Sequence, residues 1–432
     1  MRPVPAHSMT RSLWSHTAGV AAANAPLTDV VKVDVAIIGA GFTGLRAALH
    51  LSDAGTRVAV VDAADVGWGA SGRTGGQVNP MMPFNSPDRI RTLIGNRAFE
   101  LLAEQSLNSA DEVFGLIKTY QIDCQARQNG WLRVLHSKGM HKKAVGDAAN
   151  WNALGAEIAL IGKDEVDRLS GTGTYMSGMV NPRGGAVHPL MFARGLAESA
   201  RKRGAQIFGQ SAVTSLAKKG ATWHVQTAKG RIEADWVIVG TNGYTDQLIP
   251  TLQETIIPVT PIQIASEPLP SEVIDRILPQ GHTISDSRRV IMYARREPDN
   301  RIVYGGHGKT DRNGNLIGFE WLVKDAERVF PQLKGIKWAH HWGGRIAITG
   351  DHLPHLHEPQ PGLLVGLGYN GRGVAMANVM GRVMAQRVLG TAPEDLPFPT
   401  TGVKKIPFRS LQVMGMPFVI RSMRLLDRLE TR

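Results

Sequence analysis

Residues 33–63, VDVAIIGAGFTGLRAALHLSDAGTRVAVVDA, carry the pattern that most limits how this chain can fold. A run of β-branched residues over 33–38 is typical of a strand buried on both faces of a parallel sheet. Apolar residues then recur at helical spacing up to Gly55, and a second apolar run at 58–61 ends on Asp62. The glycines between the first strand and the helix are Gly39, Gly41 and Gly44, in the spacing G-x-G-x-x-G.

This order of elements is the one that a dinucleotide-binding fold needs. The first glycine permits a tight turn, the second lets backbone approach a pyrophosphate, and the third allows close packing of the helix. The helix N-terminus offers N–H groups and a partial positive charge, and the acid can hold ribose hydroxyls. A tight glycine turn without a ligand is the alternative. The residues predicted to bind the nucleotide here are Gly39, Gly41, Phe42, Thr43, Gly44, Asp62 and Ala63.

A second glycine-rich stretch, GWGASGRTGGQ at residues 67–77, follows Asp62 and contains an arginine but no acid. Such a stretch is either a flexible linker or backbone pressed against an anionic group. Its place directly behind the nucleotide motif favours the second interpretation, whereas for Arg73 a surface ion pair is the alternative. The ligand contacts predicted in this stretch are Gly69, Ala70, Ser71, Gly72, Arg73, Gly75, Gly76 and Gln77.

Later segments indicate that a second domain is inserted into the nucleotide fold. Residues 86–121 are helical in pattern, 130–135 predict a strand, and 189–204 predict a helix that starts with a proline and ends with a glycine. A hairpin that turns at Lys229-Gly230 leads into the buried strand WVIVGTNG, which returns to the nucleotide fold and supplies Thr241, Asn242 and Gly243. The predicted division is an N-terminal arm at 1–30, a discontinuous nucleotide-binding domain at 31–85, 160–250 and 340–400, a substrate-binding domain at 86–159 and 251–339, and a C-terminal tail at 401–432.

Composition narrows the classes of protein and of site. The chain has 432 residues, 43% of them hydrophobic and 20% charged, as in an ordinary globular protein of two domains. Cys124 is the only cysteine, which excludes disulfides within the chain and any multi-thiolate metal site. His340 and His341 are adjacent in a strand pattern and would point opposite ways, so no metal site is predicted.

Charge and the N-terminus bear on partners and location. A net charge of +12 is compatible with nucleic acid, a membrane surface or acidic substrates. Because no basic stripe is interleaved with aromatic residues, a solvated basic surface is favoured and no nucleic-acid partner is expected. The N-terminus imitates a signal peptide only faintly, since Ser15, His16 and Thr17 interrupt its apolar stretch. No segment is long and apolar enough to cross a membrane, so a cytoplasmic protein is expected.

Residues 362–390, GLLVGLGYNGRGVAMANVMGRVMAQRVLG, predict a second strand, glycine-rich turn and helix. A second helix N-terminus of this kind suits a flavin ring, because the N1–C2=O edge of the ring becomes anionic on reduction. The nucleotide is therefore predicted to be FAD. The predicted contacts in this turn are Asn370, Gly371, Arg372, Gly373 and Val374.

With these motifs, the sequence resembles the D-amino-acid-oxidase-like FAD-dependent oxidoreductases, the glycine and sarcosine oxidase group, over roughly residues 12–400. GASGRTGGQ and YNGRGV are most similar to the branch that contains gamma-glutamylputrescine oxidase. The resemblance implies an α/β fold, α+β overall, in which a Rossmann-like FAD-binding domain carries an inserted antiparallel-sheet substrate domain. It also implies that residues 71–73 lie along the pyrophosphate and flavin, that 75–77 pass beneath the ring, that Val213 contacts adenine and that 371–374 face the pyrimidine end.

The sequence departs from these relatives in two places. Some relatives bond the flavin through a cysteine in the segment that matches WGGRIAITGD, where this chain has Trp342, Gly343 and Gly344. We therefore expect noncovalent FAD, with Gly344 beside it. Sarcosine oxidases use a lysine near the ring to activate oxygen, and the matching segment here reads RIVYGG, residues 301–306. The electron acceptor, oxygen or a quinone, is left open.

The strand pattern VIMYAR within residues 285–306 supplies candidates for holding a substrate. Alternation places Tyr293 and Arg295 on one face, where a hydroxyl and a guanidinium could bind a carboxylate. A solvated strand face is the alternative, and Arg345 or Arg372 would then be the next anchors to consider. The residues predicted to act near the ring are Tyr293, Arg295, Trp342, Arg345 and Tyr369.

Three functions are compatible with these features. The first is oxidation of the C–N bond of an amine or amino acid by hydride transfer to flavin N5, giving an imine that water hydrolyses. The second is a dehydrogenase for a 2-hydroxy acid that passes electrons to a quinone. The third is a flavoprotein that modifies nucleic acid. The first is favoured, with a substrate that carries a carboxylate.

The tail, residues 414–432, predicts a basic amphipathic helix with Pro417 as its start. Its apolar face could pack on the protein's own body or on a second subunit, which is the favoured interpretation. Contact with an anionic membrane surface is the alternative, and it would suit a dehydrogenase that reduces a quinone.

Overall fold

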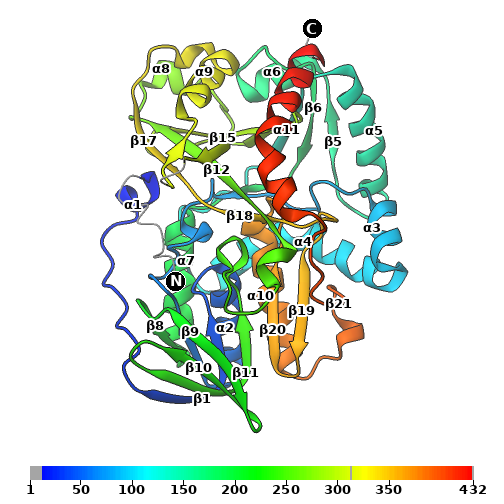
Figure 1. Ribbon diagram of the computed structural model, residues 1–432. Helices are drawn as coiled ribbons and strands as arrows, with labels where there is room; N and C mark the ends of the chain where they lie inside the picture. The colour runs from blue at the N-terminus through cyan, green and yellow to red at the C-terminus, as the bar shows by residue number, and fades with distance from the viewer. Residues whose placement is uncertain (1–11, 312–313, 431–432) are drawn as a thin grey trace.

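The computed structural model describes residues 12–311 and 314–430, and it contains two large sheets surrounded by helices (Figure 1). One sheet lies in the lower half of the view and the other in the upper half, and the chain passes between the two halves several times. Residues 1–11 of the predicted arm and 431–432 of the predicted tail lie outside the described residues.

The lower sheet has a parallel core of buried, β-branched strands. Ile37 of β1 (Val30–Ile38) lies opposite Val60 of β2 (Val58–Val61) and Ile238 of β11 (Arg231–Val239). The strand order is β21-β19-β20-β11-β1-β2-β8, and β10 and β9 extend from β11 as antiparallel strands. The other strands of this sheet are β8 (Gln206–Phe208), β9 (Val213–Lys219), β10 (Thr222–Thr227), β19 (His355–Gln360), β20 (Leu363–Leu367) and β21 (Thr400–Thr401).

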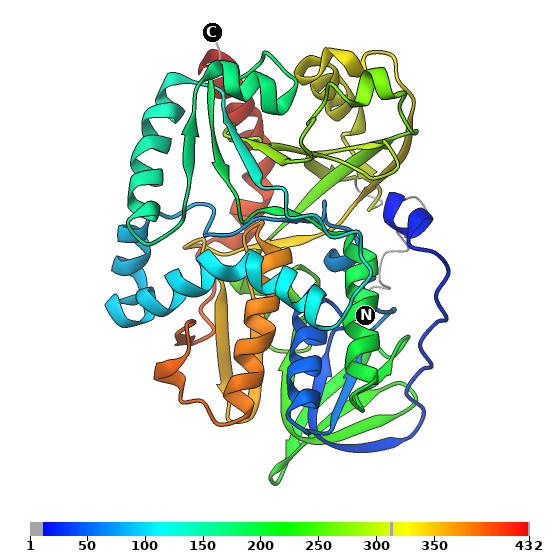
Figure 2. The ribbon, with the colours of Figure 1, turned by 180° about the vertical axis from the view of Figure 1, so that it is seen from behind.

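Four long helices gather behind this sheet, as Figure 2 shows from the back. They are α2 (Phe42–Asp53), α4 (Asn96–Thr119), α7 (Pro189–Arg201) and α10 (Gly373–Val388). Helix α2 packs against both α7 and α10 because its alanines and leucines are buried nearly all round. The predicted helical stretch 86–121 is divided at Gly95, whose positive φ ends α3 (Pro87–Ile94) before α4 begins.

The upper sheet is mostly antiparallel, in the order β17-β12-β15-β14-β13-β4-β6-β5. Its inner apolar face packs against α6 (Lys163–Ser170), α8 (Ser271–Ile274) and α9 (Phe319–Val329), while α5 (Lys138–Asn152) lies beside β4 to β6. Its strands are β4 (Trp131–Leu135), β5 (Ala159–Ile161), β6 (Ser177–Asn181), β12 (Ile257–Ser266), β13 (Thr283–Asp286), β14 (Met292–Arg296), β15 (Ile302–Thr310), β16 (Leu316–Ile317), β17 (Trp338–Gly343) and β18 (Ile346–Ile348).

Sheet membership differs from the predicted division in two places. Strand β6 and most of β5 lie within the stretch 160–250 that was assigned to the nucleotide domain, yet both strands belong to the upper sheet. Strands β17 and β18 likewise belong to the upper sheet, although most of their residues fall within the predicted segment 340–400. The sequence hides these boundaries because strand pairing over long separations, such as Trp131 opposite Asn181, leaves no local signal.

The described part of the N-terminal arm is anchored rather than loose. Helix α1 (Leu13–Thr17) buries Leu13 and Trp14 completely, and the Trp14 indole Nε1 donates to the carbonyl oxygen of Thr74 at 2.8 Å. The Trp14 ring also contacts His188 and Trp342 edge to face. The arm therefore supports the glycine-rich stretch 67–77 from one side.

Helix α11 (Arg409–Glu430) forms the tail and crosses the front of the molecule (Figure 1). It begins well before Pro417, which lies inside the helix, so the predicted start at this proline was wrong. The first turn of the helix lies upstream of this proline, where the Arg409 side chain anchors it by donating from Nε to the carbonyl oxygen of Ile256. Within the described ranges, no helix is long and apolar enough to cross a membrane.

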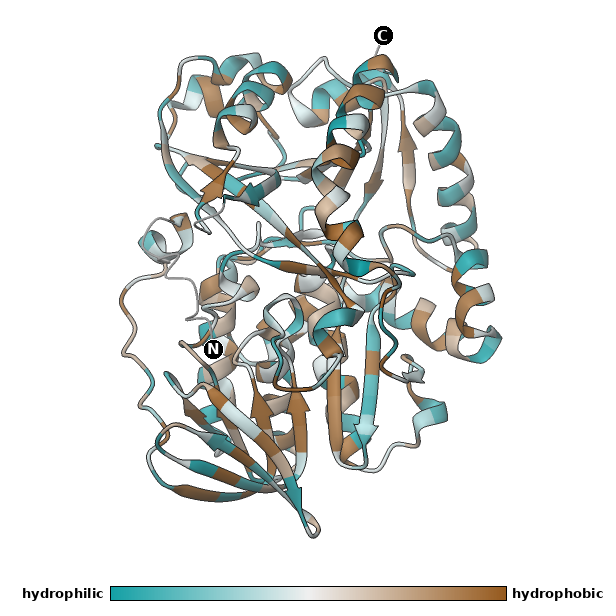
Figure 3. Ribbon diagram, viewed as in Figure 1, coloured by the Kyte–Doolittle hydropathy of each residue, from teal (hydrophilic) through white to brown (hydrophobic). Residues whose placement is uncertain are grey.

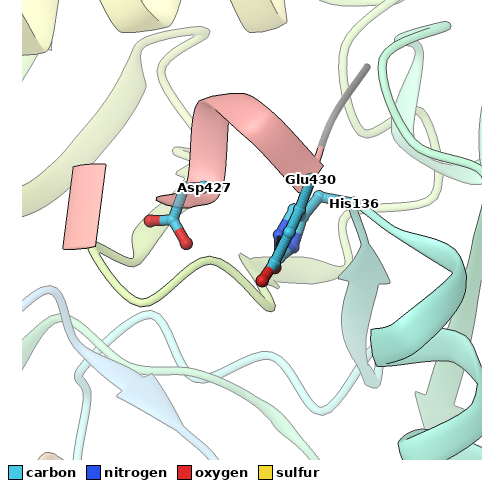
Figure 4. A group of neighbouring side chains, drawn as sticks. All are labelled: His136, Asp427 and Glu430. Carbon is cyan, nitrogen blue, oxygen red and sulfur yellow. Dashed lines mark ion pairs between the residues drawn. The ribbon is translucent and has the colours of Figure 1, made fainter. Parts of the chain in front are cut away.

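Polar contacts hold the C-terminal end of α11 (Figure 4). The buried Asp427 carboxylate accepts the backbone N–H groups of Arg289 and Val290 at 3.0 and 3.1 Å. Glu430 pairs with the Arg289 guanidinium at 2.7 Å and lies 3.4 Å from His136 Nε2. His136, Asp427 and Glu430 lie close enough to share a cation, but Arg289 already binds both carboxylates, so we describe the group as a latch for the helix.

The protein's own body covers only part of the apolar face of α11: Met416, Ile420 and Met423 are half-buried, and most of its other apolar side chains are exposed. Figure 3 shows apolar residues along the helix. The side chains that remain exposed are Phe408, just before the helix, and Leu411, Val413, Met414, Phe418, Val419, Leu425, Leu426 and Leu429.

Candidate functional site

The first glycine turn lies at the carboxyl ends of the parallel strands, where β1 leads into α2. Gly39 has a φ of 106°, which favours glycine, whereas Gly41 is extended and needs glycine only for space. A Cβ on Gly44 would overlap the carbonyl oxygen of Gly39, so the helix can pack this closely only without a side chain there. Gly41 has no side chain that could cap α2. The Ser71 hydroxyl accepts the N–H of Phe42, so the N–H groups that the first turn offers to a ligand begin at Thr43.

Asp62 follows β2 at the same edge of the sheet. Its carboxylate accepts the backbone N–H groups of Ala40 and Ala64, both at 2.8 Å, which fixes the acid beside the glycine turn and next to Ala63. Burial raises the pKa of this carboxyl, because the charged form is the one that loses hydration. The position is the one expected of an acid that binds ribose hydroxyls.

The glycine-rich stretch 67–77 is packed against the nucleotide fold and is not a flexible linker. The Ser71 hydroxyl accepts the N–H of Phe42 at 2.9 Å, which joins the stretch to the first turn of α2. Residues Ala70–Gly72 form a 3₁₀ turn after Gly69, and a Cβ on Gly72 would overlap the carbonyl oxygen of Gly67.

Arg73 is buried, so it does not form the surface ion pair considered as the alternative. Its Nε donates to the carbonyl oxygen of Trp68 at 2.7 Å, and its guanidinium lies 4.5 Å from the centre of the Trp68 ring. Burial lowers the pKa of Arg73. A guanidinium held in this way sits along the same crevice as the helix N-terminus, where the pyrophosphate is expected.

Gly75 and Gly76 lie directly against the upper sheet. A Cβ on Gly75 would come within 2.8 Å of the Tyr293 ring, and one on Gly76 would overlap the Arg295 guanidinium. Gln77 reaches further and donates through Nε2 to the carbonyl oxygens of Ala294 and Ile284 at 2.9 and 3.1 Å. We call the face of the upper sheet that meets this stretch the roof.

The second glycine turn stands next to the first. The Thr43 hydroxyl and the Tyr369 hydroxyl are hydrogen-bonded at 2.6 Å, which couples the starts of α2 and α10. Asn370 has a positive φ of 49° and its side chain holds Thr349 and Gly368, so its amide is structural and only its backbone remains for a ligand. The residues at the uncapped start of α10 are Gly371, Arg372, Gly373 and Val374.

The remaining predicted cofactor contacts come from three other segments of the chain. The Asn242 side-chain oxygen accepts the N–H of Gly368 at 2.9 Å, which ties the turn of Thr241 to Gly243 to the second glycine turn. A Cβ on Gly344 would lie 3.1 Å from the Cβ of Arg73. Val213 is buried at the start of β9.

Arg295 does not have the free guanidinium that the substrate-anchor prediction requires. It is 1% exposed, and its Nε and Nη2 both bond to the carboxylate of Glu297. Its Nη1 donates to the carbonyl oxygens of Val187 at 2.7 Å and Gly75 at 3.2 Å. The ion pair with Glu297, which directly follows β14, gives Arg295 a structural role in place of the predicted one.

The other candidates near the ring fall into different environments. Tyr293 stays on the roof above Gly75, and its hydroxyl accepts from Gln263 Nε2 at 2.7 Å. Trp342 is buried beneath the loop, where its Nε1 donates to the carbonyl oxygen of Arg73 at 3.0 Å, and Tyr369 is buried in the core. Arg345 is half-buried with its guanidinium over the Tyr244 ring. Of the five, Tyr293 and Arg295 lie on the roof against the glycine stretch, and the Arg295 guanidinium is already bound by Glu297.

Sequence reasoning missed Arg133 and Trp131 of β4, which lie on the same roof. Ser285 is directly opposite both Tyr293 and Arg133 in the strand register, so the three residues share one face. The available signal was an arginine inside the otherwise apolar strand WLRVL.

The remaining candidates for covalent or metal chemistry are buried or separated. Cys124 is in the core, and burial raises the pKa of its thiol to about 12. His340 contacts His16 while His341 contacts Phe319, so the two imidazoles point to different surroundings.

The residues at this crevice fit FAD. Two helix N-terminal turns, glycines at which a Cβ would collide, and an acid after the second strand occupy one edge of a parallel sheet. The roof closes the crevice above Gly75 to Gln77.

Comparisons with known proteins agree with this geometry. The family model described as FAD dependent oxidoreductase (DAO) matches residues 34–387. The chain is 30% identical over 423 residues to the gamma-glutamylputrescine oxidoreductase of Escherichia coli (strain K12), which covers 93% of this chain and 97% of that protein. It is also 32% identical over 370 residues to the probable oxidoreductase OrdL of Haemophilus influenzae, covering 84% and 85% of the two chains.

A solved structure supports the fold. The glycine oxidase of Geobacillus kaustophilus superposes with a TM-score of 0.71 at 20% identity and covers 83% of this chain and 95% of its own. This likeness confirms the predicted fold class.

Proposed function

Because the chain belongs to the DAO family of FAD-dependent oxidoreductases, we propose that it oxidises the C–N bond of an amine or amino acid that carries a carboxylate. The observation that carries this proposal is the near full-length similarity to gamma-glutamylputrescine oxidoreductase, together with similarity to glycine oxidases such as that of Bacillus licheniformis at 24% identity. Gamma-glutamylputrescine is itself an amine that carries a carboxylate.

FAD, when bound, supplies a hydride acceptor for a carbon that bears nitrogen. The protein residues then have to orient that carbon, keep the amine neutral and limit the access of water. The glycine stretch and the roof are suited to orienting a substrate, because Tyr293 faces Gly75 and its hydroxyl is held by Gln263. We assign the orientation of the reacting end of the substrate to this part of the roof.

A screen under anaerobic conditions tests the proposal. Purified protein with FAD is mixed with amines, amino acids and 2-hydroxy acids, and loss of the flavin absorbance is recorded. We expect bleaching by an amine or amino acid and release of ammonia or an alkylamine. Bleaching by 2-hydroxy acids alone would favour the dehydrogenase for hydroxy acids instead, and protein that takes up no FAD would contradict both functions.

We infer that the flavin is held without a covalent bond, because Cys124 is buried and Trp342 to Gly344 replace the cysteine segment of some relatives. Acid precipitation should therefore release the yellow colour into the supernatant. Flavin that stays with the precipitate would contradict this inference.

Whether the electron acceptor is oxygen or a quinone depends on whether the protein works at a membrane. The exposed apolar side chains of α11 stand beside the exposed Arg421 and Arg428, whereas its two acids, Asp427 and Glu430, are bound by Arg289. An apolar face with a basic border is the surface that an anionic membrane attracts. We therefore infer contact of this helix with an anionic membrane surface, which would bring the site close to a quinone pool.

A further inference from the structure

We propose that Arg133 and Arg372 form an anion site that holds the carboxylate of the substrate, separated along the roof from the reacting end beneath Tyr293. The proposal rests on the proposed function and names the chemistry of the substrate's far end. It makes the substrate an amine whose carboxylate is several atoms away from the carbon that is oxidised.

The two arginines come from distant parts of the chain and line one cavity. Arg133 projects from β4 of the roof, and Arg372 lies at the start of α10, where the second glycine turn is expected to face the flavin. Both side chains line a cavity whose apolar walls include Trp131, Ile158 and Met179. The cavity thus lies between the roof and the predicted pyrimidine end of the cofactor.

Neither guanidinium has an acidic partner. Among the described residues, no carboxylate oxygen forms an ion pair with Arg133 or Arg372. Asp147 is the one acid of the cavity lining, and it already pairs with Lys143 at 3.0 Å. Asp147 acts on Arg133 through its charge without contacting it, so the cavity keeps an excess of positive charge.

The Arg372 side chain is aimed into the cavity by two contacts that leave its terminal nitrogens unused. Its Nε donates to the carbonyl oxygen of Met81 at 3.2 Å, and its guanidinium lies 4.6 Å from the centre of the Trp131 ring. The Trp131 indole is itself fixed, since its Nε1 donates to the Ser285 hydroxyl at 2.9 Å. In the part of the chain that the structure describes, no protein acceptor takes the Nη1 and Nη2 hydrogens of Arg372.

Two unpaired cations in such surroundings favour an anion. Burial, with Arg133 nearby, lowers the pKa of Arg372 to about 9, and burial also lowers the pKa of Arg133. A bound carboxylate would offset the like charges and accept paired N–H groups, which is the geometry that guanidinium groups favour. The apolar wall suits the hydrocarbon part of an organic acid better than a free inorganic anion.

The strand register sets the separation between the two ends of the substrate. Tyr293, Ser285 and Arg133 are direct partners on three neighbouring strands, and Met179 continues the same row. Two strand spacings amount to roughly 10 Å between the backbones that carry Tyr293 and Arg133. An amine with its carboxylate on the reacting carbon would not reach both ends of this row.

The test uses the FAD-loaded protein and a pair of isosteric probes, butyrate and uncharged butyramide. Melting temperature and the flavin absorbance spectrum are followed as each probe is titrated. We expect butyrate to raise the melting temperature in a saturable way and butyramide to have no effect. Arg133→Met and Arg372→Met should each weaken butyrate binding at least tenfold, and Arg133→Lys should weaken it less.

Lys143→Met/Asp147→Asn is the matched control, because it removes a paired cation and anion from the same cavity and leaves the net charge unchanged, and we expect a change below threefold. Equal effects of butyrate and butyramide, or unchanged butyrate affinity in Arg133→Met, would overturn the anion site. If Arg372→Met loses FAD or fails to fold, the Arg133 variants and the comparison of butyrate with butyramide still test the anion site. Butyrate binding that depends on Arg133, in a protein whose flavin no amine reduces, would refute the proposed function and leave the anion site in place.

Discussion

At the scale of single residues, the glycines of the first turn serve two different purposes. Gly41 has an extended backbone, and a Cβ there would meet only the movable Ser71 hydroxyl at 2.9 Å. Gly44 has no such freedom, because a Cβ would collide with the carbonyl oxygen of Gly39 in the turn after β1. Glycine is therefore needed at position 41 to leave space for the ligand and at position 44 to let the fold form.

Gly41→Val should accordingly give a folded protein that does not retain FAD, since the side chain would occupy the approach to the pyrophosphate. Circular dichroism and melting in the absence of FAD would stay close to the parent apoprotein, while the flavin absorbance after purification would be lost. Gly44→Ala is the contrasting variant and should impair folding itself. Stoichiometric FAD in Gly41→Val would contradict the assignment of the motif.

Variants of Arg295 distinguish its structural role, the ion pair with Glu297, from the predicted role as a substrate anchor. Arg295→Met would leave the Glu297 carboxylate buried without its main partner, so we expect a loss of about 3 to 5 kcal/mol in unfolding free energy. The double variant Arg295→Met/Glu297→Gln should regain part of this loss. Urea titration measures both effects. A variant with normal stability and a raised substrate KM would instead restore the anchor interpretation.

At the scale of elements, α1 and the glycine stretch 67–77 act together. Trp14→Ala would leave a large gap between α1, His188 and Trp342 and remove the bond to Thr74, so we expect about 3 to 5 kcal/mol less stability and weaker FAD retention. Trp14→Phe keeps most of the ring and should lose only about 1 kcal/mol. Thermal unfolding and FAD titration of both variants measure the difference, and equal behaviour of Trp14→Ala and the parent would show that the arm is dispensable.

The start of α7 predicts a dependence of stability on pH. His188 is buried, its Nδ1 accepts the N–H of Met191 at 3.2 Å, and its Nε2 therefore donates to the Thr17 hydroxyl at 3.0 Å. Burial, with a contribution from Arg295, lowers the pKa of His188 from 6.5 to about 3. The unfolded chain binds a proton here below pH 6.5 and the folded chain does not, so stability falls as the pH drops from about 6.5 toward 3.

Each pH unit in that window should cost up to about 1.4 kcal/mol for this one group. Urea unfolding of His188→Asn, which keeps a capping side chain, should show a shallower decline between pH 6.5 and 4 than the parent protein. The half-buried His307 and the buried His357, with pKa values lowered to about 4, contribute in the same direction and remain in the variant. Identical slopes for variant and parent would show that His188 does not titrate in this way.

The elements with a strong local period were predictable from the sequence. Strand β1, helix α2 and helix α10 follow from apolar spacing and glycine turns, because both are properties of neighbouring residues. The start of α11 and the membership of β5 and β6 were not, since they depend on contacts with distant strands. The same limit applied to the roof. Alternation placed Tyr293 and Arg295 on one face, but it could not reveal that the Glu297 carboxylate binds the Arg295 guanidinium, or that Arg133 lines the same cavity as Arg372.

At the scale of the whole molecule, the site exists only where the two sheets meet. Gln77 bonds to two strands of the roof, and the Arg295 guanidinium bonds back to Gly75 and Val187. Each half alone would lack either the crevice or the roof. Substrate contacts could therefore be inferred only after the long-range pairing was known.

Helix α11 presents exposed apolar side chains that could contact a membrane or a second copy of the protein. Its polar side is latched by Arg289, and its apolar residues, with Phe418 68% and Leu425 58% exposed, face away from the body. Two copies that met through this face would bring the exposed Arg421 and Arg428 of each helix toward those of the other, which disfavours pairing. An anionic lipid surface accepts both the apolar side chains and the charges.

We therefore expect the FAD-loaded protein to co-sediment with vesicles that contain anionic lipid, less so at high salt and not with purely zwitterionic vesicles. Leu425→Ser/Leu429→Ser should abolish this binding without lowering the melting temperature, because both side chains are exposed and Asp427 stays in place. Val145→Ser/Leu160→Ser removes equally hydrophobic exposed residues elsewhere, each 42% exposed, and should leave vesicle binding intact. Failure of the parent protein to co-sediment, together with self-association that the Leu425 and Leu429 changes abolish, would assign the exposed face of α11 to a second copy of the chain instead of a membrane.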